Sequence, residues 1–102
     1  MLETFSDNLK DRGYKVYAFS DPKEALTWLN VSAIKVNALV VDYRMPGMKG
    51  SDLIKRSKKF FEPDVPVVLI SGEEISKEDR EGVTFLKKPV LLEELMRAIE
   101  QK

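Results

Sequence analysis

Residues 36–50, VNALVVDYRMPGMKG, decide the fold. The first part, Val36 to Val41, is short and nearly all apolar, which predicts a strand covered on both faces. This strand ends at Asp42, and the proline and glycines of residues 43–50 are typical of a loop. A helix from about Ser51 to Phe61 should follow. Its candidate core residues are Leu53, Ile54, Phe60 and Phe61.

The chain before this stretch predicts a helix, a strand and a second helix. Apolar residues recur at helical spacing from the start, and Gly13 stands where a left-handed cap would close the first helix. Aromatic and β-branched residues then favour a strand, and Ser20, Asp21 and Pro22 are typical of a helix start. The predicted ranges are 1–12, 14–19 and 22–30, with Leu2, Phe5, Leu9, Ala25, Leu26 and Leu29 on the buried faces.

The chain after residue 61 continues the same alternation. Residues 65–70 predict a second doubly buried strand, which ends at Ser71 and Gly72. Residues 73–81 are highly charged and leave room for at most two turns of helix; their carboxylates lack the spacing of a Ca²⁺ loop and indicate a solvated face. A short strand over 83–86 and a helix over 91–101 close the chain. The helix places Leu92, Leu95, Met96 and Ile99 on one face.

Composition narrows the chemistry that the chain can perform. The 102 residues favour a single domain, and 17 basic against 17 acidic residues give zero net charge, which argues against nucleic acid or an anionic membrane as a partner. His and Cys are both absent, so disulfides, thiol nucleophiles, imidazole bases and zinc-thiolate sites are excluded. Carboxylates, hydroxyls and lysines remain, a set suited to phosphate and to oxygen-ligated Mg²⁺ or Ca²⁺. The longest apolar run, Val67 to Ile70, is far too short to span a membrane.

Strands that alternate with helices predict an α/β fold with a parallel sheet between helix layers. The ligand crevice of such a fold lies beyond the carboxyl ends of its strands. Asp42, Ser71 and Lys88 each follow a predicted strand. Because the carboxyl ends of parallel strands lie along one edge of the sheet, we expect the three residues together at that edge, which we call the rim. A carboxylate, a hydroxyl and an ammonium group suit a phosphoryl group, because the carboxylate is a nucleophile and the lysine pairs with phosphate oxygens.

The motifs resemble the receiver domains of two-component response regulators. Asp42 is followed by Met45-Pro46-Gly47-Met48 and Gly50, then by Ser71-Gly72 and Lys88-Pro89, in the family's order along the whole chain. The resemblance implies a flavodoxin-like (CheY-like) three-layer sandwich, with residues 1–102 as a single receiver domain.

The resemblance also assigns roles to individual residues. It makes Asp42 the phosphoacceptor, Ser71 the switch hydroxyl, Lys88 the phosphate-pairing lysine and Phe85 the aromatic switch residue. Arg44 matches the position whose backbone carbonyl helps to bind Mg²⁺ together with Asp42. The bond between Lys88 and Pro89 matches a common cis peptide of the family, which a proline allows.

The sequence departs from the family pattern in two places. The family's first strand, with the acidic pair that completes the Mg²⁺ site, has no counterpart before the first helix, so we expect the domain to be incomplete at its N-terminus. Mg²⁺ should bind weakly or not at all, and phosphorylation should be slow or absent. The interval between Ser71 and Lys88 is also short, which predicts a shortened fourth helix.

The missing strand would lie between residues 14–19 and 36–41 in the family's 2-1-3-4-5 strand order. Its absence would expose unpaired backbone groups, so we expect compensation. The two flanking strands could pair directly, a strand could come from another copy, or the chain could dimerise along an edge.

The function implied is a cytoplasmic signalling module and not an enzyme. Its partner would be a sensor histidine kinase or phosphotransfer protein that donates a phosphoryl group to Asp42, and phosphorylation would switch partner binding. Contacts with a second copy would use exposed strand edges or the last strand and helix. Two alternatives remain: an interaction module that works without phosphorylation, and a small phosphate-binding enzyme, although no GxxxxGK[ST] or GxGxxG loop is present.

Overall fold

The computed structural model describes residues 2–45 and 47–100, with side chains from residue 5 onward. The elements are α1 (Leu2–Asp11), α2 (Pro22–Val31), β1 (Leu39–Asp42), β2 (Arg44–Met45), β3 (Met48–Lys49), α3 (Gly50–Ser57), the 3-10 helix η1 (Lys58–Phe60), β4 (Val67–Ser71), β5 (Thr84–Lys87) and α4 (Leu92–Ile99).

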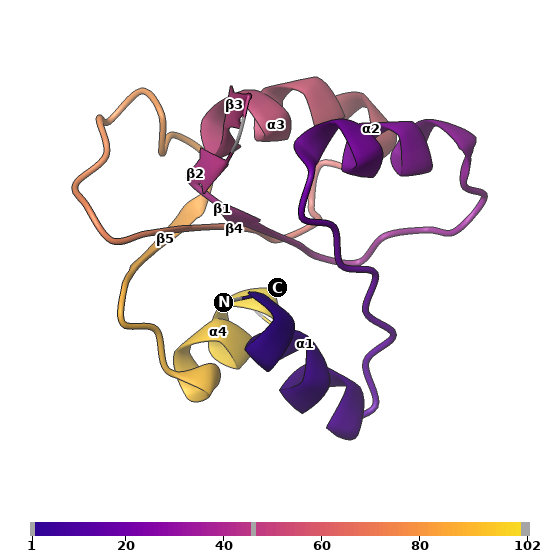
Figure 1. Ribbon diagram of the computed structural model, residues 1–102, viewed down its shortest axis with the longest axis horizontal. Helices are drawn as coiled ribbons and strands as arrows, with labels where there is room; N and C mark the ends of the chain where they lie inside the picture. The colour runs from indigo at the N-terminus through magenta and orange to yellow at the C-terminus, as the bar shows by residue number, and fades with distance from the viewer. Residues whose placement is uncertain (1, 46, 101–102) are drawn as a thin grey trace.

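A parallel three-stranded sheet in the order β1-β4-β5 forms the middle layer. Helices α2 and α3 cover one face, and α1 and α4 cover the other (Figure 1). β2 and β3 form a separate two-stranded hairpin after β1. The α/β sandwich with a parallel sheet is therefore confirmed.

The core has two halves because the side chains of β4 alternate between the faces of the sheet. Val68 and Ile70 pack with α1 and α4, and Leu69 packs with β1 and α3. All three side chains are fully buried. The buried members of the first half are Leu9, Val68, Ile70, Leu95 and Ala98, and those of the second are Val41, Leu53, Ile54, Leu69 and Ile75.

The helices predicted over 1–12 and 22–30 are confirmed as α1 and α2; Met1 and the side chain of Leu2 lie outside the described residues. The first helix ends as expected, with Gly13 at a φ of +94° and its amide donating to the carbonyl of Lys10. The carboxylate of Asp21 caps α2 by accepting from the amide of Lys23 at 2.9 Å. The prediction that α2 buries Ala25, Leu26 and Leu29 is only partly correct, because all three side chains are only partly buried.

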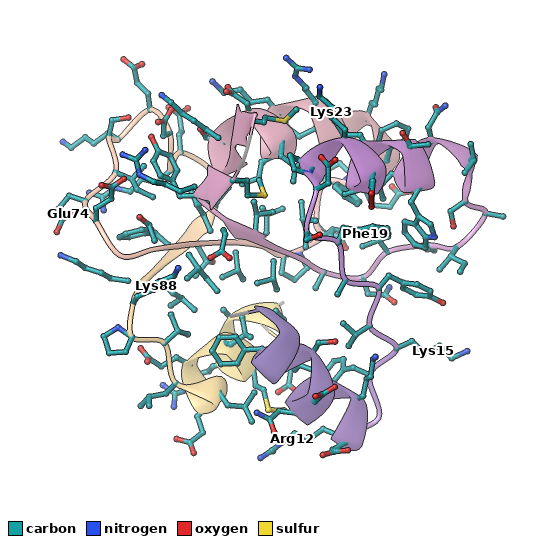
Figure 2. The ribbon with its side chains drawn as sticks, viewed as in Figure 1. Arg12, Lys15, Phe19, Lys23, Glu74 and Lys88 are labelled. Carbon is teal, nitrogen blue, oxygen red and sulfur yellow. The ribbon has the colours of Figure 1, made fainter. Side chains whose placement is uncertain are left out.

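The strand predicted over 14–19 is wrong. These residues follow α1 without regular secondary structure and pair with no strand among the described residues. Lys15 points out into solvent from this segment (Figure 2). Aromatic and β-branched residues suit a strand, but a strand forms only where a neighbour supplies hydrogen bonds. Direct pairing of this segment with β1 is therefore also wrong.

The strand predicted over 36–41 is shorter than expected and is not doubly buried. It begins at Leu39 and ends at Asp42, and only Val41 is fully buried. The reason is its position: β1 pairs with β4 alone among the described residues, so it is an edge strand.

The remaining elements differ from expectation mainly at their ends. The helix predicted over 51–61 is α3 followed by η1, and Phe60 and Phe61 are only partly buried. The predicted strands 65–70 and 83–86 are β4 and β5. Residues 73–81 form turns and no helix, although Ile75 is buried in the core. The closing helix is α4; Gln101, at the end of its predicted range, lies outside the described residues.

No helix in the described part of the chain is both long and apolar enough to cross a membrane.

Candidate functional site

Asp42 is the last residue of β1, at the carboxyl end of the sheet. The amide of Tyr43 donates to the carbonyl of Ile70 at 2.8 Å, which holds the chain against β4 just past the aspartate. Gly50 then returns the chain so closely that a Cβ there would contact the carbonyl of Asp42 and lie 2.9 Å from Leu69 Cδ1. A glycine at this position therefore lets α3 begin directly behind the aspartate.

Lys88 and Asp42 face each other across the rim of the sheet. Lys88 Nζ lies 3.5 Å from Asp42 Oδ1, and the side chains are 35% and 21% exposed. The amide of Lys88 donates to the carbonyl of Ser71 at 2.8 Å, which fixes the backbone of the lysine to the end of β4. The peptide bond between Lys88 and Pro89 is cis, as the resemblance implied.

Ser71 is the last residue of β4 and is buried, with 4% of its surface exposed. Its hydroxyl oxygen accepts a hydrogen bond from the amide of Glu73 at 3.0 Å. The hydroxyl hydrogen has no acceptor among the described residues, so it remains available to a ligand. Asp42 and Ser71 end β1 and β4, and Lys88 follows β5, so the three residues lie at the carboxyl ends of three neighbouring strands, as expected from the sequence.

Phe85 lies on β5 opposite Leu69 and is partly buried against the half of the core that contains Val41. The guanidinium carbon of Arg80 is 5.5 Å from the centre of its ring. The ring therefore contacts both the core and the 73–81 segment.

The charged segment 73–81 forms ion pairs with residues at the rim, and the sequence does not predict these contacts. Glu73 binds Arg44 at 2.6 Å, Glu74 lies 3.3 Å from Lys87, and Asp79 lies 4.0 Å from Lys49. Asp79 also accepts a hydrogen bond from the hydroxyl of Tyr43 at 2.8 Å. Partners so distant in sequence have no local signal; only the opposite charges of residues 44–49 and 73–81 could have suggested them.

These contacts shift two ionisations next to Asp42. The hydrogen bond to Asp79 raises the pKa of Tyr43 above its ordinary value of 10.0, because it stabilises the neutral phenol. The hydrogen bond to Glu73 raises the pKa of Arg44, whose guanidinium is charged at neutral pH in any case. The segment is thus attached to the rim at neutral pH by a neutral phenol and a charged guanidinium group.

The metal-binding capacity of the rim is limited. Asp42 Oδ1 is buried without a hydrogen-bond partner, and the cation that faces it is the ammonium of Lys88. Over residues 2–45 and 47–100, no three acidic, His or Cys residues are grouped so that they could hold a metal. Mg²⁺ prefers near-octahedral coordination by oxygens, so these residues alone do not form a complete Mg²⁺ site. The role of the Arg44 carbonyl stays a prediction.

The chain is similar to known signalling proteins. It is 37% identical over 87 residues to the cyclic di-GMP phosphodiesterase response regulator RpfG of Xanthomonas campestris, an alignment that covers 79% of this chain and 22% of that protein. The curated relatives are mostly much longer: the chain covers 15% of one and 58% of another.

Solved structures agree with this similarity. The receiver domain of the hybrid histidine kinase CckA matches with a TM-score of 0.82 and 33% identity, covering 97% of this chain and 85% of that one. A response regulator receiver protein from Sinorhizobium medicae matches with a TM-score of 0.83 and 28% identity, covering 98% and 82%. The family description "response regulator receiver domain" matches residues 1–100. With the rim of Asp42, Ser71 and Lys88 at the ends of a parallel sheet, this match shows that the chain belongs to the response regulator receiver domain family.

Proposed function

We propose that this chain accepts a phosphoryl group on Asp42 and that this modification changes its affinity for a partner. Receiver domains are signalling modules of two-component systems and interact with histidine kinases or phosphotransfer proteins. The observation that carries the proposal for this chain is the ion pair between Lys88 and Asp42, with the hydroxyl of Ser71 on the strand between them.

The proposed transfer uses the carboxylate as the nucleophile. Oδ1 is buried, so the other oxygen of Asp42 would attack the phosphorus atom of a phosphohistidine on the partner. The new O–P bond forms as the P–N bond breaks, and the imidazole leaves with the bonding electron pair and takes up a proton. The ammonium group of Lys88 would then pair with the phosphoryl oxygens, and the free hydroxyl hydrogen of Ser71 would donate to one of them.

Receiver domains typically bind Mg²⁺, which neutralises phosphoryl charge when it is bound. In this chain Asp42 and the carbonyl of Arg44 would contribute ligands. Since these do not complete a site, we expect weak binding and slow phosphorylation, with Lys88 as the main source of positive charge.

The proposed switch connects the phosphoryl group to the 73–81 segment. If Ser71 turns toward the phosphoryl group, it releases the amide of Glu73, whose carboxylate binds Arg44. Phe85 contacts Arg80 of the same segment and could follow inward. Phosphorylation would shift the population only by as much as the phosphoryl group prefers the rearranged state. The surface formed by the last strand and helix would then bind partners differently.

A second candidate is an interaction module that works without phosphorylation. The incomplete set of Mg²⁺ ligands favours this second candidate. In it, the contacts of Asp42, Ser71 and Lys88 would serve mainly to stabilise the backbone at the ends of the strands. In that case the Asp42→Ala variant would bind a kinase or phosphotransfer partner as tightly as the unmodified chain does. Both candidates place the protein in the cytoplasm, with contacts between copies along the free edge of β1 or through β5 and α4.

The test is incubation with a small acyl phosphate and Mg²⁺, followed by mass spectrometry of the intact chain. We expect a slow gain of one phosphoryl group, which is lost in Asp42→Asn. The matched control is Asp52→Asn, which removes an exposed carboxylate from the first turn of α3 and should label like the unmodified chain. Labelling that persists in Asp42→Asn, or no labelling of the unmodified chain, would contradict the proposal.

A further inference from the structure

A hollow lies away from Asp42, between α2 and the end of α3. It is a shallow, largely solvent-open depression with a volume of about 620 Å³. α3 runs back from the carboxyl end of β1 toward the start of β4, so its last turn and η1 lie at the opposite end of the sheet from the rim. The lining residues are Leu26, Thr27, Asn30, Lys55, Arg56, Lys59 and Phe60.

The charge in this hollow is of one sign. Lys55, Arg56 and Lys59 supply three cations, and no carboxylate is among the described residues that line it. The ion pairs of the described chain join other residues, so none of these cations is neutralised by a carboxylate within 4.0 Å. Helix C-termini favour basic residues, which accounts for their presence here and leaves their charge exposed to solvent.

The hollow also has an apolar component. Leu26 on α2 and Phe60 on η1 line it, and both are only partly buried. The ammonium group of Lys59 lies 5.3 Å from the centre of the Phe60 ring, so a cation and an aromatic surface stand next to each other. An occupant that matches both features carries negative charge beside an apolar group.

We propose that this hollow binds an acidic segment of a partner protein, in which carboxylates flank a large apolar side chain. The carboxylates would pair with Lys55, Arg56 and Lys59, and the apolar side chain would lie against Leu26 and Phe60. Charge complementarity favours an anionic occupant, and the small extent of the basic cluster beside Leu26 and Phe60 favours a short acidic segment over a nucleic acid. The cations come from one run of five residues in a chain of zero net charge, whereas a duplex needs several phosphate contacts spread along its backbone.

The experiment measures fluorescence anisotropy with a labelled synthetic peptide of Glu, Asp and Leu, with the leucines at helical spacing. The first variant is Lys55→Gln, Arg56→Gln and Lys59→Gln together. The matched control carries the same charge change on exposed residues outside the hollow, the 73–81 segment and α4: Lys10→Gln, Arg12→Gln and Lys35→Gln. We expect salt-sensitive binding that falls about tenfold in the first variant and less than about twofold in the control.

Three further probes test the occupant: the peptide with Gln and Asn in place of its acids, the peptide with Ser in place of its leucines, and a labelled DNA duplex. All should bind more weakly than the acidic, leucine-containing peptide. The proposal is overturned if the peptide does not bind, if both triple variants lose affinity equally, or if the duplex or the serine peptide binds as tightly. Amide chemical shifts of the unmodified chain give an independent reading, since residues 26–30 and 55–60 should move most.

Discussion

At the scale of single residues, the rim depends on how closely the backbone can approach Asp42. The amide of Gly50 donates to the carbonyl of Tyr43 at 2.6 Å, so the loop closes directly behind the aspartate. A side chain at position 50 has no space, because Leu69 and Tyr43 would both lie 2.9 Å from its Cβ. This glycine is required by crowding and not by a left-handed backbone.

The Gly50→Ala variant should therefore lose stability. We expect the free energy of unfolding in urea to fall by about 1 to 3 kcal/mol, because backbone and core must shift to admit one methyl group. Gly72→Ala is the control: its Cβ would meet only Lys88 Cδ, at 3.8 Å, and the change should stay within about 0.5 kcal/mol. Equal stability of the two variants would show that the loop moves freely away from Asp42.

Tyr43 gives the rim a dependence on alkaline pH. Its pKa is raised above 10.0 by the hydrogen bond to Asp79, so the folded state favours the protonated phenol more than the unfolded state does. The resulting stabilisation is fully present below about pH 10 and is lost as the pH rises through the folded-state pKa. The Tyr43→Phe variant should have a lower free energy of unfolding than the unmodified chain below about pH 10. Above about pH 10 its free energy of unfolding should fall less steeply with pH.

The measurement is urea unfolding of both chains from about pH 8 to about pH 11. Tyr17→Phe is the control, since Tyr17 stacks on Trp28 with ring centres 4.7 Å apart and makes no hydroxyl hydrogen bond within the described residues. The free energy of unfolding of Tyr17→Phe should fall with pH as that of the unmodified chain does. If the free energy of unfolding of Tyr43→Phe also falls with pH as that of the unmodified chain does, the hydrogen bond between Tyr43 and Asp79 does not contribute to folding stability.

At the scale of elements, β1 and the segment 14–19 show that a strand forms only where a neighbouring strand supplies hydrogen bonds. Both have apolar, strand-like sequences, yet β1 is ordered as a strand because β4 supplies its hydrogen bonds. Within the described part of the chain, residues 15–19 form no hydrogen bond between backbone groups. Tyr17 and Phe19 instead pack against Trp28 of α2.

Amide hydrogen exchange should separate these two segments. We expect residues 15–19 to exchange within the fastest group of amides, and residues 68–70 of β4 to exchange only through global unfolding. Exchange read by NMR, residue by residue, makes this comparison within one sample. Protection of residues 15–19 equal to that of β4 would mean that the segment pairs with a strand in solution, from another copy or otherwise.

At the scale of the whole molecule, the central strand β4 connects both halves of the core. α4 is attached to it through Leu95, which is fully buried between the helix and the sheet. Leu91, one turn earlier, is 61% exposed and lies outside the core. The same residue type therefore has two different structural roles, at the N-cap of α4 and in the buried face of the helix.

Leu95→Ala should lower the free energy of unfolding by about 2 to 5 kcal/mol, because it leaves a cavity next to Val68 and Ile70. Leu91→Ala should change it by no more than about 0.5 kcal/mol. Chemical denaturation followed by circular dichroism measures both. A small effect of Leu95→Ala would show that α1 and α4 are not an integral part of the folded domain.

The sequence by itself determined the order of the helices, the strands β4 and β5 and the placement of Asp42, Ser71 and Lys88 on one rim. Local information was sufficient for these, since helical spacing, apolar runs and strand-end residues are properties of neighbouring positions. Only the tertiary structure decided that, within the described residues, 14–19 stay unpaired and β1 is an edge strand, and that residues 73–81 bind the rim through Arg44 and Tyr43. Strand pairing and ion pairs between distant segments depend on what the folded chain brings alongside, which no local pattern specifies.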